Sequence, residues 1–132
     1  MSVESLIPHR APMCFIEELA SCDDKTASAT AHFEAGHFAE GALEFALVEC
    51  AAQSAAAALG HRAKHAGGQS GAAAHGMLAA VNSFQIQSPP PLGKKLLIEV
   101  YEVRRFGPMM LISAIVSCAG QKIACGQLTL YA

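Results

Sequence analysis

The amino-acid sequence predicts an α+β fold in which an antiparallel sheet wraps around one long central helix. The segment Ala42–Leu59 contains no glycine or proline, has high helix propensity, and is apolar on nearly every side. Four strand-like segments follow it, and one alternating segment precedes it. A helix without a polar face is buried on most sides, and a sheet that curls around it provides that burial.

The segment before the helix, Cys14–Phe33, has the pattern of a half-buried strand or a hairpin arm, with a turn near Asp23-Asp24. Small apolar and polar side chains alternate toward its end, with Ala27, Ala29 and Ala31 on one face and Ser28, Thr30 and His32 on the other. Two glycines then enclose a His-Phe pair in Gly36–Gly41, which we interpret as a shaped loop that leads into the helix.

Few polar side chains interrupt the helix, and Gly60 is expected to end it. Between Leu43 and Leu59 the polar residues are Glu44, Glu49, Gln53 and Ser54. Glycine is favourable just beyond a helix, and basic side chains suit the negative end of the helix dipole, as do His61, Arg62 and Lys64 here. The helix is therefore expected to span Ala42–Leu59 and to be buried by the sheet along most of its length.

The second half of the chain is expected to form four strands of the sheet. After a glycine- and alanine-rich connection over residues 60–76, strand patterns cover Met77–Gln87, Leu96–Arg104, Met109–Cys118 and Lys122–Tyr131. Short connections at Phe106-Gly107-Pro108 and Ala119-Gly120-Gln121 favour antiparallel hairpins. A chain of 132 residues suits one domain over residues 1–132.

The composition argues against several classes of protein. The 9 Lys+Arg against 11 Asp+Glu give a net charge of −2, so no nucleic-acid-binding surface is indicated. None of the cysteines forms a C-x-x-C pair, so neither a zinc site nor a disulfide framework is expected among Cys14, Cys22, Cys50, Cys118 and Cys125. We find no signal-peptide pattern and no apolar stretch of the ~18 residues that a spanning helix needs, so we expect a cytoplasmic domain without a membrane partner.

Glu49 is the candidate site residue that stands out most, because it is a carboxylate within an apolar helix. Burial raises the pKa of a carboxyl group, which can keep it protonated near neutral pH and available as an acid. The alternative is an edge-exposed glutamate, or one held by a structural hydrogen bond. Gln53 lies one turn further along the helix and is expected to orient the Glu49 carboxylate.

His37 is the second candidate, since it lies in the glycine-bounded loop directly before the helix. A neutral imidazole there can act as a general base, and a solvent-exposed loop histidine is the alternative. Three further histidines, His61, His65 and His75, invite a metal interpretation. They lie in a stretch without Asp, Glu or Cys, so we expect no metal site.

Four short motifs resemble those of the 3-hydroxyacyl-acyl-carrier-protein dehydratases, and they occur in the same order. Leu6-Ile7-Pro8-His9-Arg10 resembles the Leu-Pro-His-Arg opening, and Gly36-His37-Phe38 resembles the start of the Gly-His-Phe-Pro-Gly motif. Leu47–Gln53 is similar to the helix motif apolar-apolar-Glu-Ala-x-Ala-Gln. Pro91–Leu96 resembles the Pro-Gly-Asp-x-Leu turn that enters a later strand. Together the motifs span most of the chain.

The resemblance implies a hot-dog fold, in which an antiparallel sheet wraps around a central helix. It places the active site at a dimer interface, where a loop histidine of one protomer meets the helix glutamate of the other. It gives His37 the role of the base that takes the C2 proton, and Glu49 the role of the acid that protonates the departing hydroxyl group. The implied reaction converts a 3-hydroxyacyl thioester on acyl carrier protein into a trans-2-enoyl thioester, as in fatty-acid or polyene-type biosynthesis. It implies no cofactor, and a homodimer or higher homo-oligomer whose strands join edge to edge.

The segment between His37 and Glu49 is shorter than in the common enzymes, and Ala39-Glu40 stands where the family has Pro-Gly. In this respect the chain is most similar to the dehydratase-like subunits of aryl-polyene clusters, in which one hot-dog chain can pair with a different one. His32 is the alternative base if the loop has a different register. Two other functions stay open: a hot-dog acyl thioesterase, and a non-catalytic partner subunit of a heteromeric hot-dog dehydratase.

Overall fold

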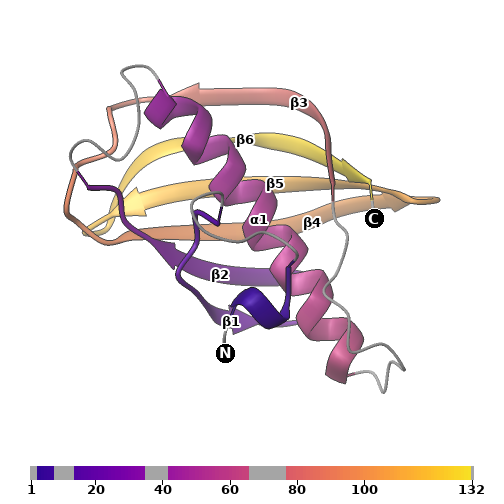
Figure 1. The fold of residues 1–132 in the computed structure, drawn as a ribbon. Helices are drawn as coiled ribbons and strands as arrows, with labels where there is room; N and C mark the ends of the chain where they lie inside the picture. Colours follow the sequence, from indigo (N-terminus) through magenta and orange to yellow (C-terminus); the bar gives the residue numbers. More distant parts are fainter. Residues whose placement is uncertain (1–2, 8–13, 35–41, 66–76, 132) are drawn as a thin grey trace.

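A curved, antiparallel sheet of six strands wraps around one long helix in the computed structural model, which describes residues 3–7, 14–34, 42–65 and 77–131 (Figure 1). The elements in chain order are η1 (Val3–Ser5), β1 (Glu18–Cys22), β2 (Thr26–Ala31), α1 (Ala42–His65), β3 (Met77–Ile86), β4 (Leu96–Phe106), β5 (Met109–Cys118) and β6 (Gln121–Tyr131). The strand order is β1-β2-β4-β5-β6-β3, so β1 and β3 are the two edges. The predicted fold class is therefore confirmed.

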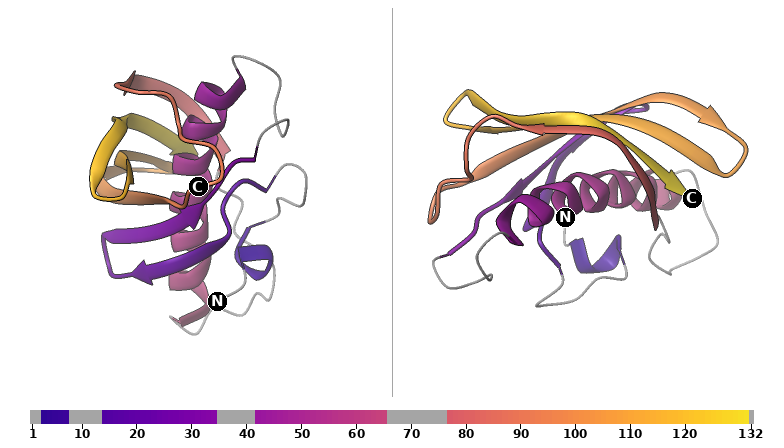
Figure 2. Two further views of the ribbon diagram at one scale, coloured as in Figure 1. Left: turned by 90° about the vertical axis from the view of Figure 1, so that its left-hand side faces the viewer. Right: turned by 90° about the horizontal axis from the view of Figure 1, so that it is seen from above.

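The core lies between the inner face of the sheet and α1. Alternation along the strands sends one set of side chains inward, as Leu96, Ile98 and Val100 of β4 are buried while Leu97, Glu99 and Tyr101 are exposed. The buried positions of α1 are mostly alanines, whose small side chains allow the strands to approach closely. In the right-hand view of Figure 2, α1 and η1 lie on one side of the sheet.

The prediction that Gly60 ends the helix is wrong, because α1 continues to His65. Gly60 is buried within the helix. A Cβ atom at this position would overlap the carbonyl oxygen of Leu6, which follows η1. The glycine therefore serves close packing of the N-terminal segment on α1. Of the helices that the structure describes, none is long and apolar enough to cross a membrane.

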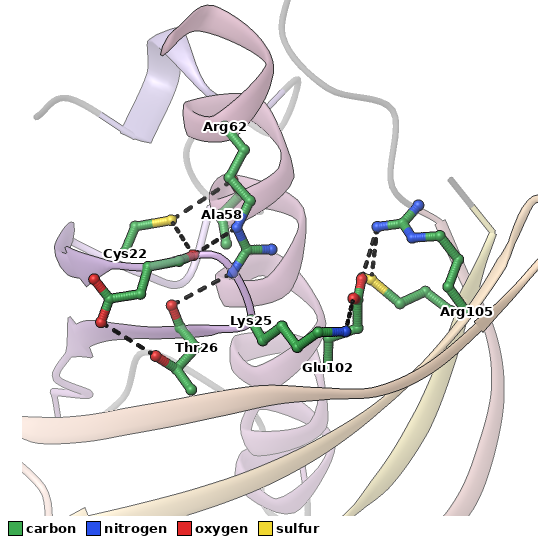
Figure 3. Close-up of polar contacts among 9 residues, drawn as sticks. Cys22, Lys25, Thr26, Ala58, Arg62, Glu102 and Arg105 are labelled. Atoms are coloured by element: carbon green, nitrogen blue, oxygen red, sulfur yellow. Dashed lines mark hydrogen bonds and ion pairs between the residues drawn. The ribbon is translucent and has the colours of Figure 1, made fainter. Parts of the chain in front are cut away.

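The last turns of α1 are tied to the β1–β2 hairpin by polar contacts (Figure 3). The Arg62 guanidinium donates from Nε to the Asp23 carbonyl oxygen at 2.7 Å and from Nη2 to the Thr26 carbonyl oxygen at 3.4 Å. The Cys22 thiol donates to the carbonyl oxygen of Ala58 at 3.8 Å. The two Arg62 bonds satisfy backbone acceptors of the hairpin turn, which lies where the sequence predicted it.

Arg104 and Arg105 lie on opposite faces of the sheet, as neighbouring residues of a strand do, and a bulge in β4 determines which face each one takes. The register of β4 against β5 shifts between Glu102 and Arg104. Arg105 then lies on the inner side, where its Nη2 donates to Glu102 Oε1 at 2.8 Å, while Lys25 Nζ donates to Glu102 Oε2 at 3.3 Å (Figure 3). Arg104 pairs with Leu111 in the register and belongs to the outer face.

Candidate active site

Glu49 and Gln53 lie one helical turn apart on the same side of α1, as the sequence predicted. Residues four apart face each other on a helix, and the Gln53 amide uses this spacing to donate from Nε2 to Glu49 Oε2 at 3.2 Å. Gln53 is 1% exposed, whereas Glu49 is half-buried. The two residues therefore join a buried amide to a carboxylate that solvent can reach.

The backbone of Phe15 determines which way the Gln53 amide points. The Phe15 N–H donates to Gln53 Oε1 at 2.8 Å. A backbone N–H can only donate, so Oε1 must face Phe15, and the Nε2 donor must face Glu49. The orientation that benefits the Glu49 carboxylate is thus imposed by a segment far away in the sequence.

Cys50 contacts the other backbone polar group of Phe15. Its thiol donates to the Phe15 carbonyl oxygen at 3.9 Å. Burial, and then the charge of the neighbouring Glu49, raise the pKa of the Cys50 thiol far above its usual range. Cys50 is therefore a neutral hydrogen-bond donor in this structure, and it is not activated as a nucleophile.

Exposure rises along one side of α1 toward its N-terminal end. Gln53 is buried, Glu49 is half-buried, and Phe45, one turn earlier, is 59% exposed. Among the described residues, Leu6 packs against this side of α1 at Gly60, and Phe15 contacts it at Gln53. Within residues 3–7, 14–34, 42–65 and 77–131, Glu49 Oε1 accepts no hydrogen bond.

The two candidate bases have different outcomes. His37 lies outside the described residues, so its predicted proximity to Glu49 stays a prediction. His32 follows β2 on the surface, with Nδ1 at 3.0 Å from Glu17 Oε2 and Nε2 at 3.3 Å from Glu34 Oε1. Both ring nitrogens of His32 therefore contact surface carboxylates.

The remaining histidines do not assemble a metal site in the described residues. The rings of His61 and His65 stack with their centroids 4.0 Å apart near the end of α1. His75 lies outside the described residues. No cluster of three or more His, Cys, Asp or Glu side chains that fits a metal ion occurs in the ranges that the structure describes.

The sequence did not reveal the contributions of Phe15 and Cys50. The bond between Phe15 and Gln53 joins residues 38 positions apart and uses a backbone group, which every residue type except proline supplies. The sequence pattern does not distinguish Cys50 from the other cysteines. Both contacts depend on how the N-terminal segment packs against α1, which only the structure shows.

Comparison with known families identifies the chain. Residues 1–132 match the family model of the ApeP-like dehydratases, described as ApeP dehydratase. The chain belongs to the ApeP-like dehydratase family. This confirms the resemblance to the dehydratase-like subunits of aryl-polyene clusters. Among curated proteins, none matches the sequence.

Solved structures similar to this ApeP-like chain share its fold. The dehydratase heterocomplex ApeI:P from Xenorhabdus doucetiae has a TM-score of 0.86 and 21% identity, over 99% of this chain and 90% of that chain. The E. coli PaaI protein from the phenylacetic acid degradation operon has a TM-score of 0.65 and 14% identity, over 87% and 82%. A hypothetical thioesterase from Streptococcus pneumoniae has a TM-score of 0.64 and 13% identity, over 86% and 88%. The predicted hot-dog fold is confirmed.

Proposed function

We propose that this chain catalyses the dehydration of 3-hydroxyacyl thioesters, carried on acyl carrier protein in the cytoplasm, to trans-2-enoyl thioesters. The observation that carries the proposal is the Glu49 carboxylate, which has one oxygen held by Gln53 and the other open, in a chain of a dehydratase family. A carboxyl group at the boundary between a buried helix and solvent suits proton donation to a substrate hydroxyl group.

In the proposed reaction the two candidates divide the proton transfers. The neutral His37 imidazole takes the proton from C2, and the electron pair forms the double bond between C2 and C3. The C3 hydroxyl group leaves as water with a proton from Glu49 Oε1. Backbone N–H groups near the N-terminal end of α1 polarise the thioester carbonyl and stabilise the negative charge that develops on its oxygen. No cofactor takes part.

We infer that the working unit contains at least two hot-dog chains. The edge strand β3 exposes Val81 and Ile86, and an unpaired edge can join another strand to continue the sheet. A homodimer or higher homo-oligomer satisfies this edge, and so does a heterodimer with another hot-dog chain. The heterocomplex ApeI:P supports the heterodimer as a specific alternative.

Carrier-protein mass spectrometry tests the reaction directly. The purified chain, alone and together with a hot-dog chain from the same organism, is incubated with a 3-hydroxyacyl-carrier protein. We expect the acyl group to stay on the carrier and to lose one water molecule. Release of a free acid would instead indicate a thioesterase and contradict the proposal.

The same assay separates a catalytic subunit from a non-catalytic partner, the second candidate that ApeI:P favours. If this chain supplies the acid, the complex containing Glu49→Gln should lose its dehydratase activity. An active complex whose rate does not respond to Glu49→Gln would assign the chemistry to the other chain.

A further inference from the structure

We propose that the outer face of β4 is a self-association surface, on which two copies of this chain pack face to face with Glu99 of each copy bound to Arg104 of the other. The proposal goes beyond the dehydratase function and does not depend on it. It concerns the side of the sheet opposite α1, whereas the proposed reaction involves α1 and the association through β3 uses an edge.

The outer face carries a cluster of large apolar side chains. Leu97, Tyr101, Val103 and Phe106 of β4 and Ile115 of β5 are each 37–49% exposed. In the right-hand view of Figure 2, the described part of the chain leaves this side of the sheet uncovered. Single exposed apolar residues are ordinary, but a contiguous group on one strand pair is typical of an interaction surface.

Two opposite charges lie within this apolar face without partners. Glu99 and Arg104 are exposed, and neither has a hydrogen bond or ion pair within residues 3–7, 14–34, 42–65 and 77–131. The neighbouring Glu102 and Arg105, on the inner side of the bulge, are bound to each other. The surface therefore offers one acid and one base for an intermolecular contact.

The order of side chains along the outer face of β4 is self-complementary. Leu97 and Glu99 precede Tyr101, and Arg104 and Phe106 follow it at matching distances along the strand. A two-fold axis midway between two facing sheets, perpendicular to the β4 strands and level with Tyr101, places Glu99 of each copy opposite Arg104 of the other, and Leu97 opposite Phe106. Facing sheets pack about 10 Å apart with strands within about 30°, which keeps residues near the axis in register.

The surface beside Glu99 has room for the incoming arginine. An open hollow of about 330 Å³ lies on the outer face, with Ser28, Glu99, Tyr101 and Ser113 among its lining residues. Because the serine side chains are short, they leave space above this part of the sheet. Glu99 supplies a carboxylate that can bind a guanidinium in bidentate fashion, and Tyr101 supplies an aromatic face.

A second copy of this chain fits both charges at once. A partner with only basic groups would bind Glu99 but repel Arg104, and a partner with only acidic groups would do the reverse. A two-fold symmetric pair repeats the same contact twice, because residue 99 of each copy meets residue 104 of the other. Charge complementarity and symmetry thus point to the same occupant.

Charge reversal tests the contact by sedimentation equilibrium of the full chain at micromolar concentration. Glu99→Arg places two basic side chains opposite each other, and Arg104→Glu places two acidic ones. Each variant alone should have half the mass of the wild-type assembly. Circular dichroism and thermal melting check that both variants keep the fold.

Mixing the variants gives the decisive readout. An equimolar mixture of Glu99→Arg and Arg104→Glu places an arginine opposite a glutamate in both contacts, so the wild-type mass should return. Lys64→Glu, on α1 and therefore on the other side of the sheet, makes the same charge change as Arg104→Glu. Alone it should keep the wild-type mass. Mixed with Glu99→Arg it should associate only with itself, so that the Glu99→Arg half of the mixture stays at half mass.

Three results would overturn the proposal. The first is a wild-type chain that sediments as a monomer. The second is folded single variants that keep the wild-type mass, and the third is a mixture of the two variants that stays at half mass. A chain that associates as predicted but fails as a dehydratase would refute the proposed function and leave this surface intact.

Discussion

At the scale of single residues, Gln53 connects the N-terminal segment to the candidate acid. Its Oε1 accepts the Phe15 N–H and its Nε2 donates to Glu49, so the side chain fixes one carboxylate oxygen and leaves the other open. Amide side chains are easily overlooked in helices, where they are usually exposed. Here the amide is buried, and both of its ends have a hydrogen-bond partner.

Replacing Gln53 by Glu tests whether Gln53 positions the Glu49 carboxylate, because the new side chain has nearly the same size and so preserves the packing. The new carboxylate can still accept the Phe15 N–H, but in its ionised form it has no donor for Glu49 and adds a like charge about 3 Å away. We expect turnover of the active assembly to fall about 10- to 100-fold, because small displacements of a reacting group are costly. Steady-state kinetics measure this effect, and Gln127→Glu at an exposed site of β6 is the control. An unchanged rate in a folded Gln53→Glu variant would show that Gln53 does not position Glu49 for the reaction.

Glu102 makes stability depend on pH. Burial raises the pKa of this carboxyl group, but the hydrogen bonds and charges of Arg105 and Lys25 outweigh it and hold the pKa below its usual range. A lowered folded-state pKa stabilises the protein above the unfolded-state pKa, and the stabilisation is lost as pH falls through the folded-state pKa.

The difference in unfolding free energy between wild type and Glu102→Gln should therefore be largest near neutral pH, at up to about 1 kcal/mol. It should shrink as pH falls below about 4. Urea unfolding at several pH values measures it. A difference that grows with acidity would show that the ion pairs do not stabilise the fold.

At the scale of elements, the β5–β6 turn contains an alanine in a left-handed backbone conformation that alanine does not favour. Ala119 has φ 53° and Gly120 has φ 81°, the left-handed pair of a tight hairpin turn. Alanine in this region costs about 1 kcal/mol, whereas asparagine tolerates it. Ala119→Asn should raise the free energy of unfolding by about 0.5–1 kcal/mol in denaturant melts. Gly120→Ala should lower it, and the opposite pair of signs would contradict this description of the turn.

Gly60 of α1 is predicted to resist a substitution that helix propensity favours. Alanine is better than glycine within a helix by about 1 kcal/mol. A Cβ atom at this position overlaps the backbone oxygen of Leu6, so the segment after η1 must move. We expect Gly60→Ala to lower the thermal midpoint. A raised midpoint would show that the N-terminal segment does not need this close contact.

The same glycine shows where sequence patterns stop being informative. The apolar character of the helix, the alanine alternation of β2 and the hairpin turns are local signals, and they predicted the strands to within a few residues. The end of α1 was wrong, because a glycine inside a helix and one beyond it look alike without knowledge of Leu6. The proximity of Glu49 and Gln53 was predictable from their spacing in the helix, whereas the hydrogen bond from the Phe15 N–H to Gln53 was not.

At the scale of the whole molecule, this chain presents surfaces that point to an assembly. Among the described residues, Glu49 and Phe45 are partly open on α1, β3 is an uncovered edge, and the outer face of β4 carries apolar and charged groups. The edge and the outer face point in different directions. One hot-dog partner can therefore occupy the edge while a second copy occupies the outer face.

The central claim is that His37 and Glu49 form one acid–base pair. Its most direct test is the hydration of a crotonyl thioester, the reverse reaction, followed by loss of the enone absorbance, in the assembly that is active with the wild-type chain. Glu49→Gln and His37→Ala should each lower the rate by about 10²-fold or more. The double variant should lose far less than the product of the two, because the residues act as a unit. A folded Glu49→Gln variant with the wild-type rate would contradict the account.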